Sequence, residues 1–321
     1  MLYPLRFEPL FRRYLWGGRR LESVLRKPIG AGDDYAESWE IVDHGADQSV
    51  VAFGSLSGTT LHELMTEQGD ALLGRHHPQS QFPLLFKFLD AQRDLSVQVH
   101  PNDQQAAQLD PPDLGKTEAW VILDAEPGSQ IYAGLRGQID RDEMATRIGQ
   151  GETASCLHQF EARVGDCVFI PAGTVHAIGA GLLVAEIQQA SDTTYRLYDW
   201  DRAGADGKPR QLHIEQALDV IRFDTGPVEP QQPAATEDAE VSRLVACDKF
   251  VLDRWAFSED KRLPDDARCR LVAVVDGSVN VKHDAAGSPL SQGQTMLVPA
   301  ETGGVRITPR GKCVMLVMYL P

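Results

Sequence analysis

The sequence predicts a mainly β protein that consists of two β-barrel modules of one type, with a few short helices. Residues 247–320 form a nearly continuous series of short apolar runs separated by Gly, Pro, Asp and Asn, which is typical of strands joined by turns. In addition, residues 165–172 resemble residues 293–300, since each stretch has a turn glycine, an apolar strand and a Pro-Ala exit. The preceding strand also recurs, at residues 120–124 and 272–276.

The repeat suggests how the chain divides into domains. A polar Pro/Gln-rich stretch, residues 227–240, is the best linker candidate and separates an N-terminal module, residues 1–226, from a C-terminal module, residues 241–321. When the repeat is carried forward, His176 of the first module falls opposite Gly304 of the second. We therefore expect metal ligands in the first module alone. Because Gly-x-apolar-Pro segments are common in β proteins, chance similarity is the alternative explanation.

The predicted helices are few and lie in the first module. Thr60 followed by Glu63 is a capping-box pattern and predicts a helix over residues 60–69. A second helix is predicted to start at Asp140, where a carboxylate can accept from backbone N–H groups. Apolar residues at helical spacing predict a third over residues 213–223.

Composition narrows the class of function. The formal net charge of −15 opposes binding to nucleic acid and to anionic membranes, so we expect neither partner. The five cysteines are scattered and lack CxxC spacing, which is typical of reduced thiols in a cytoplasmic protein. Residues 1–16 lack the apolar region of a signal peptide, and the apolar run 313–320 is too short to span a bilayer.

Three short segments carry potential metal ligands. They offer one amide oxygen, one carboxylate and two imidazoles, a mixed set suited to zinc or another borderline divalent ion. Residues i and i+2 of a strand point to one face, so Gln98 and His100 can project into one cavity. If Glu118 and His176 arrive on neighbouring strands, four ligands converge. The alternatives are a Gln98 that hydrogen-bonds a loop and imidazoles that are satisfied within the core.

The segments around these residues resemble a known family. Residues 165–176, GDCVFIPAGTVH, resemble the second motif of the cupin β-barrel. Together with residues 95–103 (LSVQVHPND), 115–120 (GKTEAW) and 191–196 (SDTTYR), they look like type I mannose-6-phosphate isomerase (phosphomannose isomerase), with the shorter bacterial form the closer match. The resemblance implies two jelly-roll-like cupin barrels and one zinc ion per chain. The implied zinc ligands are Gln98, His100, Glu118 and His176.

The resemblance also implies a reaction, the interconversion of mannose 6-phosphate and fructose 6-phosphate through an enediol(ate). A metal ion near the substrate oxygens O1 and O2 would act as a Lewis acid. A base that moves the proton must reach both C1 and C2. The sequence does not single out this base: Glu186, Lys116, a metal-bound water and His100 all remain open. Arg196 is implied as an active-site residue that stabilises developing negative charge. A surface ion pair is its alternative, with partners among Asp199, Asp201 and Glu186.

An acidic protein needs local cations to hold a phosphate. The candidates are Lys87, Lys116 and Arg196, with Ser96 as a hydroxyl donor that shares the strand alternation of Gln98. Lys87 lies in an apolar strand pattern, and a lysine is rarely buried there without a partner, so an inward-facing Lys87 indicates an anionic ligand. Its alternative is a side chain that snorkels from a barrel rim.

Other functional classes remain as rivals. Another metal-dependent cupin, such as an iron dioxygenase, would share His100, Glu118 and His176. A different sugar-phosphate isomerase and a non-catalytic bicupin that binds a sugar phosphate are the others. The expected assembly is a monomer or a homodimer, and the sequence alone does not identify the native metal.

Overall fold

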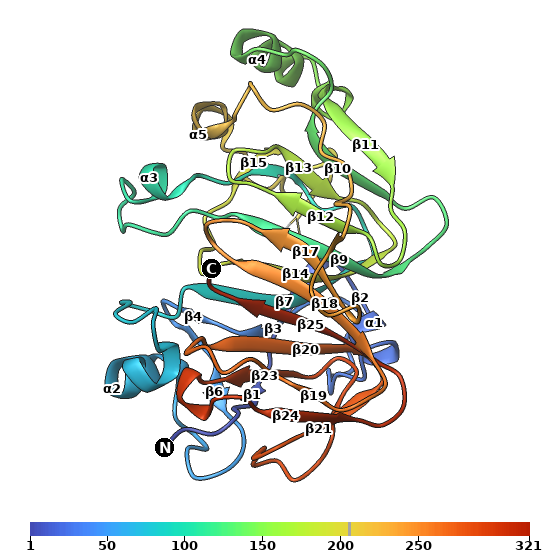
Figure 1. Cartoon of the computed structure of the whole chain (residues 1–321). Helices are drawn as coiled ribbons and strands as arrows, with labels where there is room; N and C mark the ends of the chain where they lie inside the picture. Colours follow the sequence, from blue (N-terminus) through green and yellow to red (C-terminus); the bar gives the residue numbers. More distant parts are fainter. Residues whose placement is uncertain (205–206) are drawn as a thin grey trace.

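The protein, seen in a computed structural model that describes residues 1–204 and 207–321, consists of antiparallel sheets stacked in layers (Figure 1). Two sheets form the first sandwich. Its five-stranded sheet has the order β11 (Leu157–Glu161), β10 (Gln130–Leu135), β13 (His176–Ile178), β8 (Val97–Val99), β15 (Tyr195–Tyr198). Its six-stranded sheet has the order β12 (Cys167–Ile170), β9 (Glu118–Ala125), β14 (Leu182–Gln189), β7 (Leu84–Ala91), β3 (Tyr35–Ile41), β2 (Leu10–Gly18).

The C-terminal region forms a second sandwich. Its six-stranded sheet has the order β16 (Ala234–Ala235), β17 (Val241–Ala246), β18 (Val251–Phe257), β25 (Cys313–Tyr319), β20 (Arg270–Asp276), β23 (Thr295–Val298). The four-stranded sheet has the order β19 (Lys261–Arg262), β24 (Arg306–Pro309), β21 (Ser278–Val281), β22 (Leu290–Ser291). Two small ribbons pair β1 (Phe7–Glu8) with β6 (Val50–Val51) and β4 (Asp43–His44) with β5 (Asp47–Gln48).

The prediction of a mainly β, jelly-roll-like fold is confirmed, with one correction. The sheets do not close into barrels; each module is a pair of facing sheets whose apolar side chains meet between them. A jelly roll packs two sheets in this way and fills the space between them with side chains, so the edge strands of the two sheets need not hydrogen-bond to each other.

The internal repeat is confirmed in the backbone. Val168 pairs with Trp120 in β12 and β9, and the equivalent residues Met296 and Val272 pair in β23 and β20. The turn glycines match as well. Gly165 donates its N–H to the Ile122 carbonyl over 2.9 Å, and Gly293 donates to the equivalent Val274 carbonyl over 2.8 Å. Both glycines have positive φ, at +92° and +80°, a conformation that favours glycine.

The two six-stranded sheets face each other in the middle of the molecule and share one hydrophobic core (Figure 1). Alternation along the strands explains this arrangement: Phe86 and Phe88 of β7 point toward the C-terminal sheet, whereas Lys87 points into the first sandwich. The predicted linker also contacts both modules, because Gln231 donates to the Cys167 carbonyl over 2.7 Å and β16 pairs with β17. The division at residues 227–240 stays a prediction.

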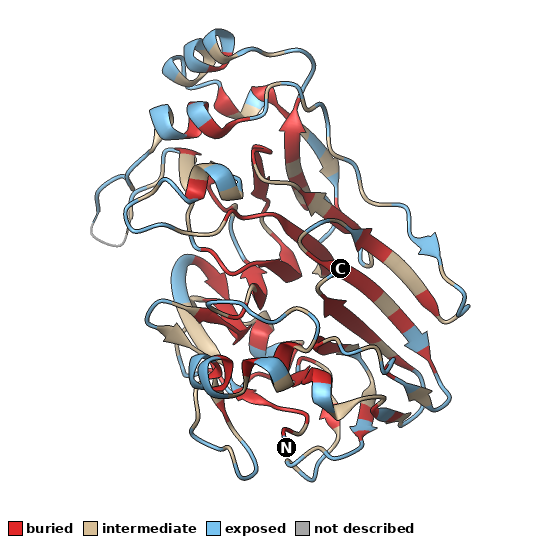
Figure 2. Cartoon of the chain, turned by 60° about the vertical axis from the view of Figure 1, so that its left-hand side comes forward, coloured by how far each residue is buried: buried red, intermediate tan, exposed pale blue. Residues whose placement is uncertain are grey.

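The helices are short and lie at the surface, where exposed residues gather (Figure 2). The bounds are α1 (Arg20–Ser23), α2 (Leu61–Leu73), α3 (Asp103–Ala106), α4 (Arg141–Gly149), α5 (Ile214–Val220), with 3₁₀ turns η1 (Thr153–Cys156) and η2 (Ala300–Thr302). The capping box of Thr60 and Glu63 is present at the start of α2, and Asp140 caps α4. Helix α2 continues four residues beyond the predicted end at residue 69, because Leu72 and Leu73 pack in the core. Among the described helices, none has the length and apolar character that would let it cross a membrane.

Candidate active site

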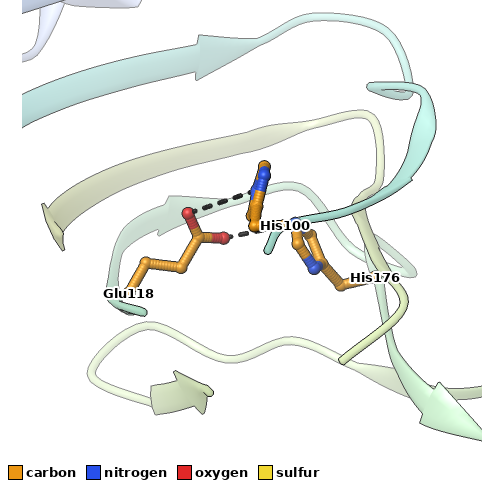
Figure 3. Close-up of side chains that lie close together, drawn as sticks. All are labelled: His100, Glu118 and His176. Carbon is orange, nitrogen blue, oxygen red and sulfur yellow. Dashed lines mark ion pairs between the residues drawn. The ribbon is translucent and has the colours of Figure 1, made fainter. Parts of the chain in front are cut away.

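Three of the predicted metal ligands meet inside the first sandwich. His100 follows β8, Glu118 begins β9 and His176 begins β13, and their potential ligand atoms all lie within 4.8 Å of one another (Figure 3). His176 Nε2 is 3.2 Å from Glu118 Oε1, and His100 Nε2 is 3.6 Å from Glu118 Oε2. All three side chains are almost completely buried. A surface ion pair would not be desolvated to this extent, so the cluster has the character of a built site.

Glu118 and His176 do not lie on neighbouring strands, which was the condition under which the sequence let the ligands converge. Glu118 belongs to the six-stranded sheet, whereas His176 pairs with Gln98 in the facing five-stranded sheet. The ligands therefore converge across the interior of the sandwich. This explains why their order in the sequence is no guide to which strands are adjacent: a jelly roll places successive strands in alternate sheets.

Both imidazoles are held in the tautomer that a metal requires. His100 Nδ1 lies 2.9 Å from the Thr193 carbonyl oxygen, and His176 Nδ1 lies 2.9 Å from that of Thr174. A carbonyl only accepts, so each Nδ1 carries the proton and each Nε2 presents a lone pair. Burial lowers the pKa of His176 to about 4, and burial together with the Lys116 ammonium holds the pKa of His100 well below its ordinary value. Neutral imidazoles result.

The donor set fits a divalent cation. Two imidazole nitrogens and a carboxylate, within 4.8 Å of one another, are the donor types that bind zinc and other borderline divalent ions. Lys116 Nζ lies 3.0 Å from His100 Nε2 and 2.9 Å from Glu118 Oε2, so these lone pairs already point at a positive charge. The Gln98 amide lies beside this set, with Nε2 3.3 Å from His176 Nε2. Its role as a ligand stays a prediction.

A polar cavity of about 310 Å³ opens beside this cluster. Its walls carry every other site residue that the sequence predicts, namely Lys87, Ser96, Lys116, Glu186 and Arg196. The aromatic rings of Trp16 and Trp120 also line it. The structure thus brings all the predicted site residues to one place, but their individual roles stay predictions.

Lys87 does not snorkel to a rim. It is 6% exposed and faces the cavity from β7, with Nζ 3.5 Å from Glu37 Oε2 and 3.6 Å from Glu186 Oε1. Burial alone would lower the pKa of Lys87, but the carboxylates of Glu186 and Glu37 outweigh burial and raise it. Because two carboxylates already neutralise this ammonium, an inward-facing Lys87 does not by itself require an anionic ligand.

Glu186 has the environment of a proton-transfer group. Glu186 lies in the middle of β14, opposite Lys87 of β7 on one side and Trp120 of β9 on the other. Its Oε1 has no hydrogen-bond partner among the described residues. Burial raises the pKa of Glu186 to about 7, with the Lys87 ammonium opposing and the Glu118 carboxylate adding to the rise. A carboxyl with this pKa can both take and return a proton near neutral pH.

Arg196 and Arg210 form a cationic wall on the opposite side of the cavity. Arg196 donates from Nε to Ser96 Oγ over 3.1 Å and from Nη1 to the Gln211 carbonyl over 3.0 Å. Within the described parts of the chain, Arg196 forms no ion pair, and Asp199 instead pairs with Arg202 and Arg210. Burial, and to a smaller extent the nearby Arg210 charge, lower the pKa of Arg196. The alternative of a surface ion pair for Arg196 is therefore wrong.

Sequence reasoning missed several cavity residues. The missed polar lining residues are Tyr14, Glu37, Asp192, Thr194 and Arg210. Glu37 carried a usable signal, because a charged residue in a buried strand is as unusual as Lys87, and it shares a strand face with Trp39. Arg210 carried none, since it lies in a polar loop. His213 precedes α5 without a side-chain cap; its Nδ1 accepts from the Arg196 backbone N–H over 3.2 Å.

Comparisons with known proteins identify the family. Residues 5–129 match the model of the phosphomannose isomerase type I catalytic domain, and residues 240–320 match the mannose-6-phosphate isomerase cupin domain. The chain is 36% identical to mannose-6-phosphate isomerase ManA of Bacillus subtilis, over 97% of this chain and 98% of that protein. It is 35% identical to mannose-6-phosphate isomerase of Streptococcus mutans, over 93% of both chains.

A solved structure is also similar along the whole length. The crystal structure of the mannose 6-phosphate isomerase from Bacillus subtilis superimposes with a TM-score of 0.91 at 30% identity, covering 99% of this chain and 100% of that one. The matches cover both sandwiches and the strands that carry the buried His and Glu ligands. The chain belongs to the type I phosphomannose isomerase family.

Proposed function

We propose that this protein is a metal-dependent aldose–ketose isomerase that interconverts mannose 6-phosphate and fructose 6-phosphate. The single observation that carries the proposal is a metal-type cluster, His100, Glu118 and His176, at the edge of a charged cavity. That cavity combines a carboxylate suited to proton transfer with two arginines suited to a phosphate. Family membership supports the choice of reaction.

The buried cluster would hold the metal ion, and we propose zinc, with Gln98 as a further ligand. Imidazole and carboxylate donors in a nearly closed set suit zinc better than calcium or magnesium, which prefer oxygen ligands alone. When bound, the ion would supply Lewis acidity beside the substrate oxygens that gain negative charge.

We propose Glu186 as the residue that moves the proton between C1 and C2. Glu186 lines the cavity that must hold the sugar, its Oε1 accepts no hydrogen bond among the described residues, and its raised pKa suits both directions of transfer. Lys116, with Nζ 3.9 Å from Glu186 Oε1, would keep the ionised form accessible and donate to a substrate oxygen. Lys87 balances the Glu186 charge from the other side.

Arg196, Arg210 and Ser96 are the proposed phosphate contacts. Guanidinium groups match phosphate oxygens with paired N–H donors. Here the two positive charges of Arg196 and Arg210 outnumber the single negative charge of Asp199. This arrangement favours the arginine wall over Lys87 for the phosphate, because Lys87 is already paired with two carboxylates. Lys87 then serves the proton-transfer site.

One experiment tests the proposal. Metal content of the purified protein is measured together with turnover of mannose 6-phosphate, before and after removal of metal with a chelator and after its return. Turnover that follows metal content is expected. Binding of mannose 6-phosphate without turnover would indicate a sugar-phosphate-binding bicupin. Turnover of other sugar phosphates alone would indicate a different isomerase, and oxygen consumption would indicate a dioxygenase. A cytoplasmic location and a monomer or homodimer stay predictions from the sequence.

A further inference from the structure

Asp113 joins two loops that flank the metal cluster. It lies between α3 and β9, and its carboxylate is largely buried. Asp113 Oδ2 accepts from Ser191 Oγ over 2.8 Å and from Thr193 Oγ1 over 2.6 Å. Asp113 Oδ1 accepts from the Leu114 backbone N–H over 2.8 Å and lies 3.2 Å from His44 Nε2. The two hydroxyl contacts hold the loop over residues 190–194, and the contacts with Leu114 and His44 hold the Asp113 carboxylate in place.

The loop that Asp113 holds reaches the metal cluster through its backbone. The Thr193 carbonyl oxygen lies 2.9 Å from His100 Nδ1, and this hydrogen bond sets the tautomer and the ring orientation of His100. The neighbouring residues Asp192 and Thr194 line the substrate cavity. A shift of the loop would therefore turn the imidazole and change the cavity wall together.

We propose that Asp113 is a positioning residue: through Thr193, it holds the His100 imidazole in the orientation that binds the metal. The chain of contacts runs from carboxylate to hydroxyl, along the Thr193 backbone, and from carbonyl to imidazole. A carboxylate suits this task because it accepts from two hydroxyl groups at once and makes stronger hydrogen bonds than a neutral acceptor. The inference rests on the metal site of the proposed function.

The test measures metal affinity, which does not depend on turnover. The dissociation constant for Zn²⁺ is determined by competition with a chromophoric chelator for wild type, Asp113→Ala, Thr193→Val and the double variant. Loss of groups that orient a ligand typically weakens metal binding about 10–100-fold, so we expect each single variant to weaken it about tenfold. The double variant should bind Zn²⁺ no more weakly than the weaker-binding single variant, because both substitutions interrupt the same chain of contacts.

Three controls separate positioning from general destabilisation. Thr193→Ser keeps the hydroxyl and should bind Zn²⁺ within about twofold of wild type. Asp253→Ala removes a buried carboxylate of the second sandwich that accepts from Arg243 and Tyr319, and should lower the melting temperature without changing Zn²⁺ affinity. His176→Ala should abolish tight binding.

The outcomes are distinct. Wild-type affinity in both Asp113→Ala and Thr193→Val, with melting temperatures lowered as in Asp253→Ala, would overturn the positioning role. If Asp113→Ala does not fold, Thr193→Val decides alone, because valine matches threonine in shape and loses only the hydroxyl. If wild type and His176→Ala bind Zn²⁺ equally, the metal site of the proposed function has failed, which is a separate result.

Discussion

The two sandwiches share a strand pair in the same register but differ at the positions of the proposed metal ligands of the first. The repeat aligns Glu118 with Arg270 and His176 with Gly304. Arg270 is buried like Glu118, yet it pairs with Asp266, 2.8 Å from both carboxylate oxygens, and stacks on the Tyr319 ring. A guanidinium has no lone pair for a metal and always carries positive charge.

The interior of the second sandwich is apolar, whereas that of the first is charged. The second is filled by an apolar cluster that includes Trp255, Leu263, Val274, Met296 and Met315. The first keeps charged side chains around a cavity. One backbone pattern therefore supports either a packed core or a reactive site, and a few side chains decide between them.

His176→Ala removes the donor that the second sandwich also lacks at the aligned position. We expect loss of bound metal and a fall in kcat of more than about a thousandfold, because the remaining ligands no longer enclose the ion. Metal analysis and a turnover assay measure both effects, and circular dichroism should show a folded β protein. Full activity in metal-free His176→Ala would contradict the metal-dependent mechanism.

Glu186→Gln removes the proposed proton carrier and leaves the metal ligands in place. We expect kcat to fall about 10²–10⁴-fold at unchanged metal content. In wild type, kcat should rise with pH through about 7, because the carboxylate accepts a proton only when ionised. This rise should disappear in the variant. Glu37→Gln is the matched control, since it alters the other carboxylate beside Lys87; an equal loss there would remove the special role of Glu186.

Arg196→Ala tests the cationic wall, which a phosphate requires. Loss of charge-assisted hydrogen bonds of about 1.5–3 kcal/mol should lower kcat/KM for mannose 6-phosphate about 10–100-fold at unchanged metal content. Metal content is measured beside the kinetics. Arg147→Ala on α4 is the control, because this arginine pairs only with surface carboxylates. Unchanged kinetics in Arg196→Ala would exclude Arg196 from the site.

Lys87→Met distinguishes the two roles considered for this lysine. Because the Lys87 ammonium lowers the pKa of Glu186, its removal should raise that pKa and move the pH midpoint of kcat upward. The pH profile of kcat measures this shift. A rise in KM for the phosphorylated sugar alone, with the midpoint unmoved, would instead assign Lys87 to the phosphate.

Arg270→Ala should change stability alone. Removal of its two bonds to Asp266 should lower the free energy of unfolding by about 1–3 kcal/mol, with kcat within about twofold of wild type. Urea unfolding and the turnover assay measure the two quantities. A large loss of kcat in a folded Arg270→Ala protein would show that the second sandwich takes part in catalysis.

The sequence was a good guide wherever the relevant interaction is local. The capping box of Thr60 and Glu63 and the Asp140 cap each span three residues, and both helices start where these signals lie. The turn glycines and apolar strands of the repeat likewise follow from neighbours in the chain. The meeting of His100, Glu118 and His176 was predictable because few residue types bind zinc, and these occur in a recognisable motif.

The pairing of charges was not predictable. Lys87 lies between Glu37 and Glu186 because β3, β7 and β14 are adjacent, and Asp113 reaches Thr193 across 80 residues. Arg210 faces the cavity from a loop without a recognisable pattern.

The repeat, the starts of α2 and α4 and the four side chains proposed to bind metal all follow from the amino-acid sequence without the structure. The fold places the proposed ligands on facing sheets, sets Lys87 between two carboxylates and leaves Arg196 without an ion pair among the described residues. The two kinds of feature depend on interactions over different separations along the chain. Periodicity and caps act between neighbouring residues, whereas charge balance in a buried cavity depends on which distant strands pair and in which register.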